Sequence, residues 1–263
     1  MKKHLRIYWL FFKTSWQIFM SHRFNFFMGI VANVLWTLSQ LVTLRFLFFK
    51  VNTFIDWSMG DMVLLLGLGQ IYVYVSWMVF EPNFSDLFRK INTGVFDRML
   101  TKPINIKFFA SFEKVMVSQL LPTLTTVIPL IIYGLRTRQA FSMVDFGLAL
   151  IVCFFGVVAM YLLGLALSGL VFLFEDIQSV RDLLTMQITE LSRVPLSVFP
   201  KLIQHILTFI IPLGFIAFFP VQIIRNQASF SLVLLGELVV IVVLYLLSKV
   251  TWKLGLKHYS GVG

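Results

Sequence analysis

The chain has 263 residues, of which 59% are hydrophobic and only 13% are charged, and its mean hydropathy is +0.88. A soluble domain carries about a quarter charged residues, so the composition excludes an ordinary water-soluble protein and predicts an all-α integral membrane protein. The net charge of +10 would suggest nucleic-acid binding in a soluble protein. Here the basic residues lie between apolar runs, which indicates the positive-inside rule and no nucleic-acid partner.

Motifs for catalysis, nucleotide binding and metal binding are absent from the sequence. It contains no GxxxxGKS/T phosphate loop, no HExxH and no GxSxG. Cys153 is the only cysteine, so an internal disulfide and a CxxC site are both excluded. The scattered histidines are His4, His22, His205 and His258. We therefore expect no catalytic residue, no metal and no cofactor on this chain.

Apolar runs long enough to span a bilayer recur along the chain, since a helix needs about 20 apolar residues to do so. The first run follows residues 1–23 and is too long for the apolar part of a signal peptide, so we expect no cleaved signal. The third run is expected to extend back to Phe108 on the cytoplasmic side. The five clear runs are 24–49, 62–80, 115–133, 144–174 and 231–247.

The segment 175–226 permits two topologies. In the first, 177–194 is the fifth span and 195–224 forms a re-entrant pair of short helices on the outer side. In the second, 206–224 is the fifth span and the residues before it are cytoplasmic. Both give six spans and place both ends on one side. The prolines that favour broken helices, and so the first topology, are Pro195, Pro200, Pro212 and Pro220.

Charge predicts which side the ends occupy. Of the 22 Lys and Arg residues, the first topology places about 15 inside, and the second moves Arg193 and Lys201 inside as well. Both topologies therefore predict cytoplasmic termini, and the charge distribution by itself slightly favours the second.

Residues 1–23 have the pattern of a helix that lies in the membrane surface. A Trp- and Phe-rich face opposes a basic face, which is typical of interfacial helices. The alternative is that this segment only leads into the first span. The apolar face comprises Leu5, Tyr8, Trp9, Phe12, Trp16 and Phe19.

The loop 81–107 is the longest cytoplasmic segment between the predicted spans. Gly94 and Pro103 bound a short amphipathic helix within it. Such a helix suits docking to a soluble partner, although a solvated loop with affinity for the membrane surface fits the same pattern. The candidate interface residues are Gly94, Val95, Phe96, Asp97, Arg98, Met99, Leu100 and Pro103.

Charged residues within the predicted spans are few. Glu190 and Arg193 are one turn apart and can pair. Glu237 lies in the last span among apolar neighbours, where a charge costs about 2.5–3.5 kcal/mol, so it is expected to face the bundle interior. Glu190 and Glu237 are candidates for lining a pathway, and an interhelical hydrogen bond is the alternative for Glu237.

Taken in order, four features resemble the permease subunits of ABC-2 type exporters. The first is the N-terminal surface helix, and the second is residues 94–104, GVFDRMLTKPI, which are similar to a "G…L…KP" coupling segment. The third is residues 193–212, which are similar to the "YP-x-x-x-YP … LT-x-x-x-P" stretch of a bacterial subgroup. The fourth is residues 252–260, WKLGLKHYS, which are similar to the "W-x-x-G-L-x-x-Y-x-S" ending of that subgroup. Val194 replaces the usual aromatic residue, and Gly261 stands where a second Ser is common.

This resemblance implies a partner and a location. Such permeases work in the bacterial cytoplasmic membrane as homodimers or heterodimers, on separate ATPase subunits that bind the ATP and Mg²⁺. The loop helix docks on the ATPase, and the broken region between spans five and six forms the outer gate, which favours the re-entrant topology. The expected function is export of a hydrophobic or amphipathic substrate. A self-contained channel or secondary transporter is the alternative, and the scarcity of intramembrane charges counts against it.

Overall fold

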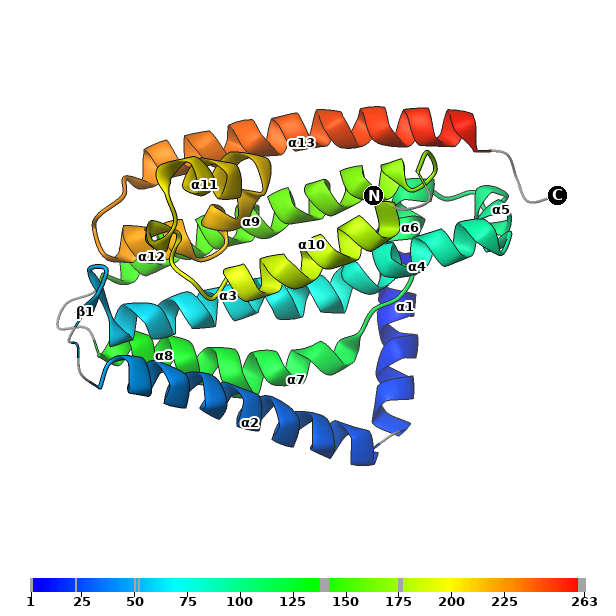
Figure 1. Cartoon of the computed structure of the whole chain (residues 1–263). Coiled ribbons are helices and arrows are strands. Elements are labelled where there is room, and N and C mark those ends of the chain that lie inside the picture. The colour runs from blue at the N-terminus through cyan, green and yellow to red at the C-terminus, as the bar shows by residue number, and fades with distance from the viewer. Residues whose placement is uncertain are drawn as a thin grey trace.

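Long helices lie side by side in a bundle, and one further helix crosses the end of that bundle (Figure 1). This computed structural model describes residues 2–21, 23–49, 51, 53–137, 142–174 and 177–259. Five helical stretches of the described chain are long and apolar enough to span a membrane. These stretches are Phe27–Leu47, Met59–Asn92, Val117–Arg136, Met143–Leu170 and Phe230–His258. Their number and order agree with the five apolar runs of the sequence.

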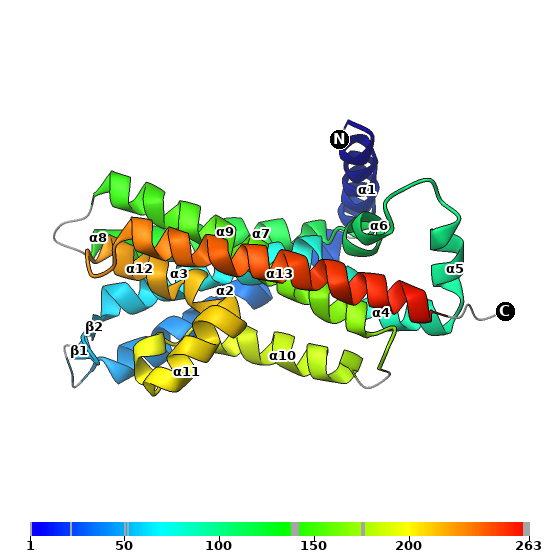
Figure 2. The ribbon, with the colours of Figure 1, turned by 90° about the horizontal axis from the view of Figure 1, so that it is seen from above.

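The N-terminal part comprises two separate helices, α1 (Lys2–Ser21) and α2 (Arg23–Leu47). α1 is the helix that crosses the bundle end, and α2 lies along the bundle (Figures 1 and 2). The predicted break between them falls at His22, which lies outside the described residues. A small hairpin of β1 (Thr53–Phe54) and β2 (Trp57–Ser58) follows α2. The sequence analysis did not predict these two short strands.

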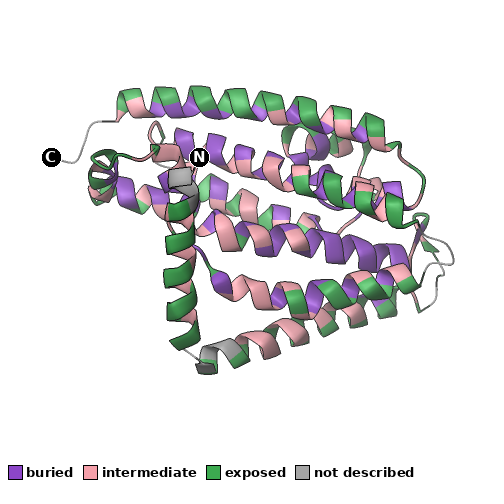
Figure 3. Cartoon of the chain, turned by 180° about the vertical axis from the view of Figure 1, so that it is seen from behind, coloured by how far each residue is buried: buried purple, intermediate pink, exposed green. Residues whose placement is uncertain are grey.

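Helix α3 (Met59–Val79) forms the centre of the bundle, and most of its residues are buried (Figure 3). Its first turn is fixed by a capping box, in which Asp61 accepts from the backbone N–H of Ser58 and donates its own N–H to the Ser58 hydroxyl. At its far end the chain continues almost directly into α4 (Glu81–Asn92). The second predicted span thus extends beyond the bundle as α4.

The third predicted span differs from the expectation at its N-terminal end. The residues from Phe108 onward were expected to continue into the span, but α6 (Ile106–Phe112) is a separate helix that ends before Glu113. The side chain of Asn83 explains the break, because it donates to the Lys114 carbonyl at 2.9 Å and accepts from the Lys114 N–H at 2.7 Å. The span itself is then assembled from η1 (Val117–Gln119), α7 (Leu120–Pro122), η2 (Thr123–Val127) and α8 (Ile128–Arg136).

Helices α9 (Met143–Leu170) and α13 (Phe230–His258) pack together over much of their length. Gly169 permits the close approach near the C-terminal end of α9, since a Cβ there would lie 2.8 Å from the backbone N of Trp252. The indole N–H of Trp252 donates to the Leu165 carbonyl at 2.7 Å. Both helices are longer than the bilayer requires, so α13 extends well beyond the 231–247 run.

The segment between α9 and α13 contains one helix along the bundle and several short pieces. The helix is α10 (Ile177–Leu191), which packs against α9 and α4. Between α10 and α13 the longest helical run is Lys201–Ile210. It has only ten residues and is too short to span a bilayer. The short pieces are η3 (Leu196–Val198), α11 (Lys201–His205), η4 (Ile206–Ile210), η5 (Pro212–Phe215) and α12 (Phe218–Ile224).

The short pieces after α10, from η3 to α12, form the broken segment. Trp57 of the β1–β2 hairpin contacts residues near both ends of it. Its indole N–H donates to Ser197 at 3.0 Å, and its ring lies 5.7 Å from that of Phe218. The Arg225 guanidinium lies 4.7 Å from the Trp57 ring and 3.5 Å from the carboxylate of Asp61. The short pieces after α10 therefore begin and end near the β1–β2 hairpin.

Candidate functional site

Helices α4 and α5 (Val95–Leu100) form a hairpin beyond the end of the bundle (Figure 1). Gly94 makes the turn between them with a φ of 67°, a left-handed conformation that favours glycine. After α5 the chain returns through a loop to α6, where the Asn105 side chain caps the helix by accepting from the backbone N–H groups of Lys107 and Phe108. The predicted short helix is therefore present, bounded by Gly94 as expected.

The side chains of α5 are not arranged as the sequence predicted. Val95, Phe96, Met99 and Leu100 were expected to form one free contact face, but Phe96 and Met99 are buried within this chain. The Phe96 ring lies 5.0 Å from Phe172 and 5.2 Å from Tyr259, so it anchors α5 to the bundle. Helical spacing alone cannot tell a face that packs on the same chain from one that binds a partner.

Asp97 adds a polar anchor to the same contact. Its carboxylate accepts from the Tyr259 hydroxyl at 2.8 Å. Burial and this carboxylate raise the pKa of Tyr259 to about 12, so the hydroxyl stays protonated and remains a donor at neutral pH. Asp97, a candidate for the partner interface, thus makes its polar contact within this chain. The hairpin residues left exposed include Arg89, Arg98, Leu100, Lys102 and Pro103.

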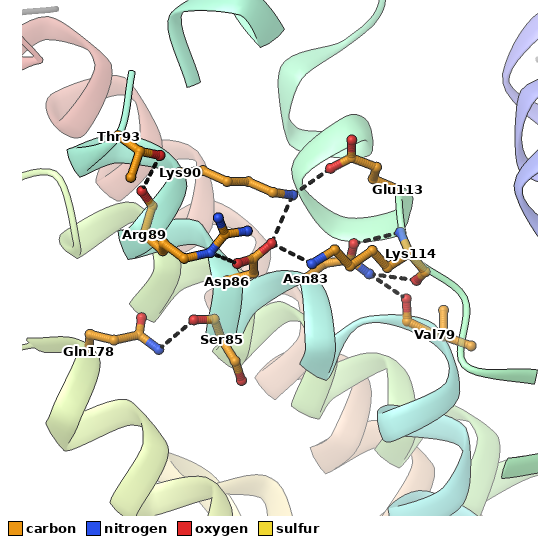
Figure 4. Close-up of polar contacts among 10 residues, drawn as sticks. All are labelled: Val79, Asn83, Ser85, Asp86, Arg89, Lys90, Thr93, Glu113, Lys114 and Gln178. Atoms are coloured by element: carbon orange, nitrogen blue, oxygen red, sulfur yellow. Dashed lines mark hydrogen bonds and ion pairs between the residues drawn. The ribbon is translucent and has the colours of Figure 1, made fainter. Parts of the chain in front are cut away.

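A cluster of charged side chains fixes the base of the α4–α5 hairpin (Figure 4). Asp86 accepts from Arg89 at 2.6 Å and from Lys114 at 2.6 Å. Lys90, which is buried, binds Glu113 and lies 3.8 Å from Asp86. These ion pairs join α4 to the break between α6 and the third span.

Arg181 joins the base of the α4–α5 hairpin to α10. Its Nη1 donates to Glu81 at 2.9 Å, and its Nη2 donates to Ser85 at 2.7 Å and to Asp182 at 2.7 Å. Arg181 and Glu81 are both buried, with 2% and 4% of their surface exposed. Figure 4 shows Gln178 beside Ser85, and its amide donates to the Ser85 carbonyl at 3.3 Å. α4 and α10 are therefore connected by a buried, charge-assisted contact.

Comparison with known families decides the class of this chain. A family model described as ABC-2 family transporter protein matches residues 34–263. The chain belongs to the ABC-2 transporter family. No curated protein and no solved structure matches it.

Membership makes this chain the membrane component of an ABC transporter, a class that is not itself catalytic and that typically works with an ABC ATPase. The match covers the α4–α5 hairpin, α10, the broken segment and α13, whereas α1 and the first part of α2 lie before it. Within the described residues no group of three or more His, Cys, Asp or Glu side chains could hold a metal ion.

The structure of this ABC-2 permease places the two candidate pathway residues differently. Glu190 is exposed and accepts from Arg193 at 2.9 Å, the pair predicted from their spacing. The Arg193 guanidinium also lies 5.4 Å from the Trp36 ring on α2. Glu237 is fully buried, and neither carboxyl oxygen has a hydrogen-bond partner among the described residues. Glu237 is thus enclosed by its own chain, whereas Glu190 faces outward.

The sequence analysis missed Arg181 and Glu81 as a pair. Arg181 was visible as a charge in a moderately apolar helix, and Glu81 as the first residue after the second span. Their separation of 100 residues leaves no local pattern that could join them. Only the placement of α10 against α4 brings the two side chains together.

Proposed function

We propose that this chain is the permease subunit of an ATP-driven exporter, and that the α4–α5 hairpin docks on a separate ATPase subunit. The observation that carries the proposal is the hairpin itself, which extends beyond the bundle and is held rigidly by Phe96, Met99 and the Asp97–Tyr259 bond. Leu100 is 45% exposed on it, between the exposed Arg98 and Lys102. An exposed apolar side chain among basic groups is a plausible centre for a protein contact.

Movement of the hairpin reaches the transport pathway through Arg181. Because α4 and α10 share the buried Arg181–Glu81 contact, a shift of α4 displaces the start of α10. The other end of α10 leads into the broken segment at the β1–β2 end. ATP binding to the partner can drive this change only by as much as it favours the shifted state. This connection supports the proposal that the broken segment acts as a gate.

A second permease copy, or a related permease, is proposed to cover the face formed by α2 and α10. Next to Glu190, the carbonyl of Ser192 lies close to Gly69, the eleventh residue of α3. At the rise of an α-helix, the eleventh residue lies about 15 Å from the first residue of α3. A carboxylate that is 64% exposed at such depth would be costly against lipid tails. A partner permease, or a pathway between two permeases, removes that cost.

The proposed topology places both ends in the cytoplasm and the broken segment on the outer side. In a Cys153→Ala background, a cysteine at Thr53 or at Lys201 is expected to react with an impermeant thiol reagent on whole cells, and one at Lys257 is not. All three positions are exposed, so access to the aqueous side decides the result. Labelling at Thr53 with protection at Lys201 would instead establish the topology in which 206–224 is a full span.

Retention of an ATPase tests the function directly. When the tagged chain is co-expressed with the ABC ATPase encoded in its gene neighbourhood, we expect the two to elute together from gel filtration in detergent. The complex should hydrolyse ATP, and an ATPase whose phosphate-loop lysine is replaced should be retained without hydrolysis. Transport by the chain alone, driven by an ion gradient and with no ATPase retained, would show a secondary transporter instead.

A further inference from the structure

A groove lies between α1, α6, α9 and α13 near the end of the bundle that α1 crosses (Figure 2 shows these helices). Its volume is about 930 Å³, and it is open on one side. The walls are mainly apolar and aromatic, with Phe112, Leu162 and Leu165 among them. The proposed ATPase contact on α5 does not use it.

Two lysines face this groove without an acidic partner. Lys107 donates to the Ser248 carbonyl at 3.3 Å, and Lys249 lies 4.5 Å from the centre of the Tyr245 ring. None of the eleven described residues that line the groove is acidic. Partial burial and the nearby Lys249 lower the pKa of Lys107. Both lysines therefore lack a counter-charge within the described part of the groove.

The aromatic residues of α1 indicate the depth of the groove in the membrane. α1 carries exposed Trp9 and Trp16, whose rings stack along the helix through Phe12. Trp residues of this kind concentrate at the membrane–water interface. Tyr8 of the same helix lines the groove and contacts Phe112 edge-on at 6.1 Å. Helix α1 thus forms one wall at the membrane surface, next to the basic end of α13.

We propose that this groove binds one anionic phospholipid from the leaflet that α1 lies in, with its phosphate between Lys107 and Lys249 and its acyl chains along Phe112, Leu162 and Leu165. Basic pockets between helices at the cytoplasmic side of a membrane protein recognise anionic headgroups. The apolar walls select a lipid over free phosphate, because they would remain exposed if only the anion were bound. The bound lipid would fasten α1 to α6 and α13.

Native mass spectrometry of the full chain, titrated with defined lipids, tests this proposal. We expect phosphatidylglycerol to bind more tightly than phosphatidylcholine. Lys107→Gln and Lys249→Gln should each weaken phosphatidylglycerol binding about fivefold, since one lysine near an anionic headgroup contributes about 1 kcal/mol. The double variant should bind both lipids equally, whereas the Lys107→Arg, Lys249→Arg variant should keep the preference.

The matched control is Lys201→Gln, which removes the same charge from an exposed lysine at the β1–β2 end. It should bind phosphatidylglycerol like the unaltered chain. Equal binding of the two lipids to the unaltered chain, or an unchanged preference in the double variant, would overturn the proposal. Displacement of the lipid by millimolar inorganic phosphate would also overturn it, because the groove would then be a phosphate site.

Discussion

Replacing Arg181 with Met is expected to lower the free energy of unfolding by about 3–5 kcal/mol, the usual cost of removing one partner of a buried ion pair. Glu81 would keep its carboxylate between α3, α4 and α10 with the guanidinium gone. Ser85 and Asp182 would lose the same donor. The measurement is thermal or denaturant unfolding of the purified chain in detergent.

The matched control is Arg89→Met on α4. Arg89 also forms an ion pair, with Asp86 at 2.6 Å, but 62% of its side chain is exposed. Exposed ion pairs contribute little because water screens them, so this variant should be nearly as stable as the unaltered chain. Equal losses in the two arginine variants would show that Arg181 is not enclosed as described.

A second variant separates the loss of stability from the loss of the connection between α4 and α10. Arg181→Met combined with Glu81→Gln removes both charges, so most of the lost stability should return. The charge-assisted link between α4 and α10 would still be missing. We expect this variant to retain the ATPase but to transport poorly for each ATP hydrolysed. Full transport in the double variant would exclude Arg181 as the connection to α10.

The sequence predicted the spans well because bilayer thickness imposes a long apolar run on each one. The runs 62–80 and 144–174 correspond closely to α3 and α9 for this reason. The N-terminal end of the third span was predicted wrongly, because α6 is separate from it, and the side chain of Asn83, 31 residues before Lys114, binds the backbone at the break. Long-range hydrogen bonds of this kind leave no periodic signal in the sequence.

The turn before α5 was predicted, but the orientation of the α5 side chains was not. Gly94 marked the start of α5 because its turn requires a positive φ, which has a local sequence cause. The direction of Phe96 depends on Phe172 and Tyr259, which belong to distant parts of the chain. The orientation of Glu237 was predicted, because a charge within an apolar span is costly unless it faces the bundle interior, and its side chain is buried.

Replacing Leu100 with Asp is expected to abolish retention of the partner ATPase while leaving the chain folded. Leu100 is exposed in this chain, so an aspartate there meets water until the partner binds. In the complex the new carboxylate would be buried against the ATPase, and an unpaired buried charge at the centre of a contact costs several kcal/mol. The measurement is co-elution of the ATPase in gel filtration, with the yield and unfolding temperature of the chain recorded in parallel.

Two further variants make this result interpretable. Thr53→Asp introduces the same charge at an exposed residue of β1, on the opposite end of the bundle, and should retain the ATPase fully. Phe96→Asp should also lose the ATPase but for a different reason, because burial of the charge against Phe172 and Tyr259 detaches α5 and lowers the unfolding temperature. Loss of binding with unchanged stability is therefore expected only for Leu100→Asp. If Leu100→Asp retains the ATPase at full stoichiometry, the exposed face of α5 is a solvated surface and the docking contact lies elsewhere.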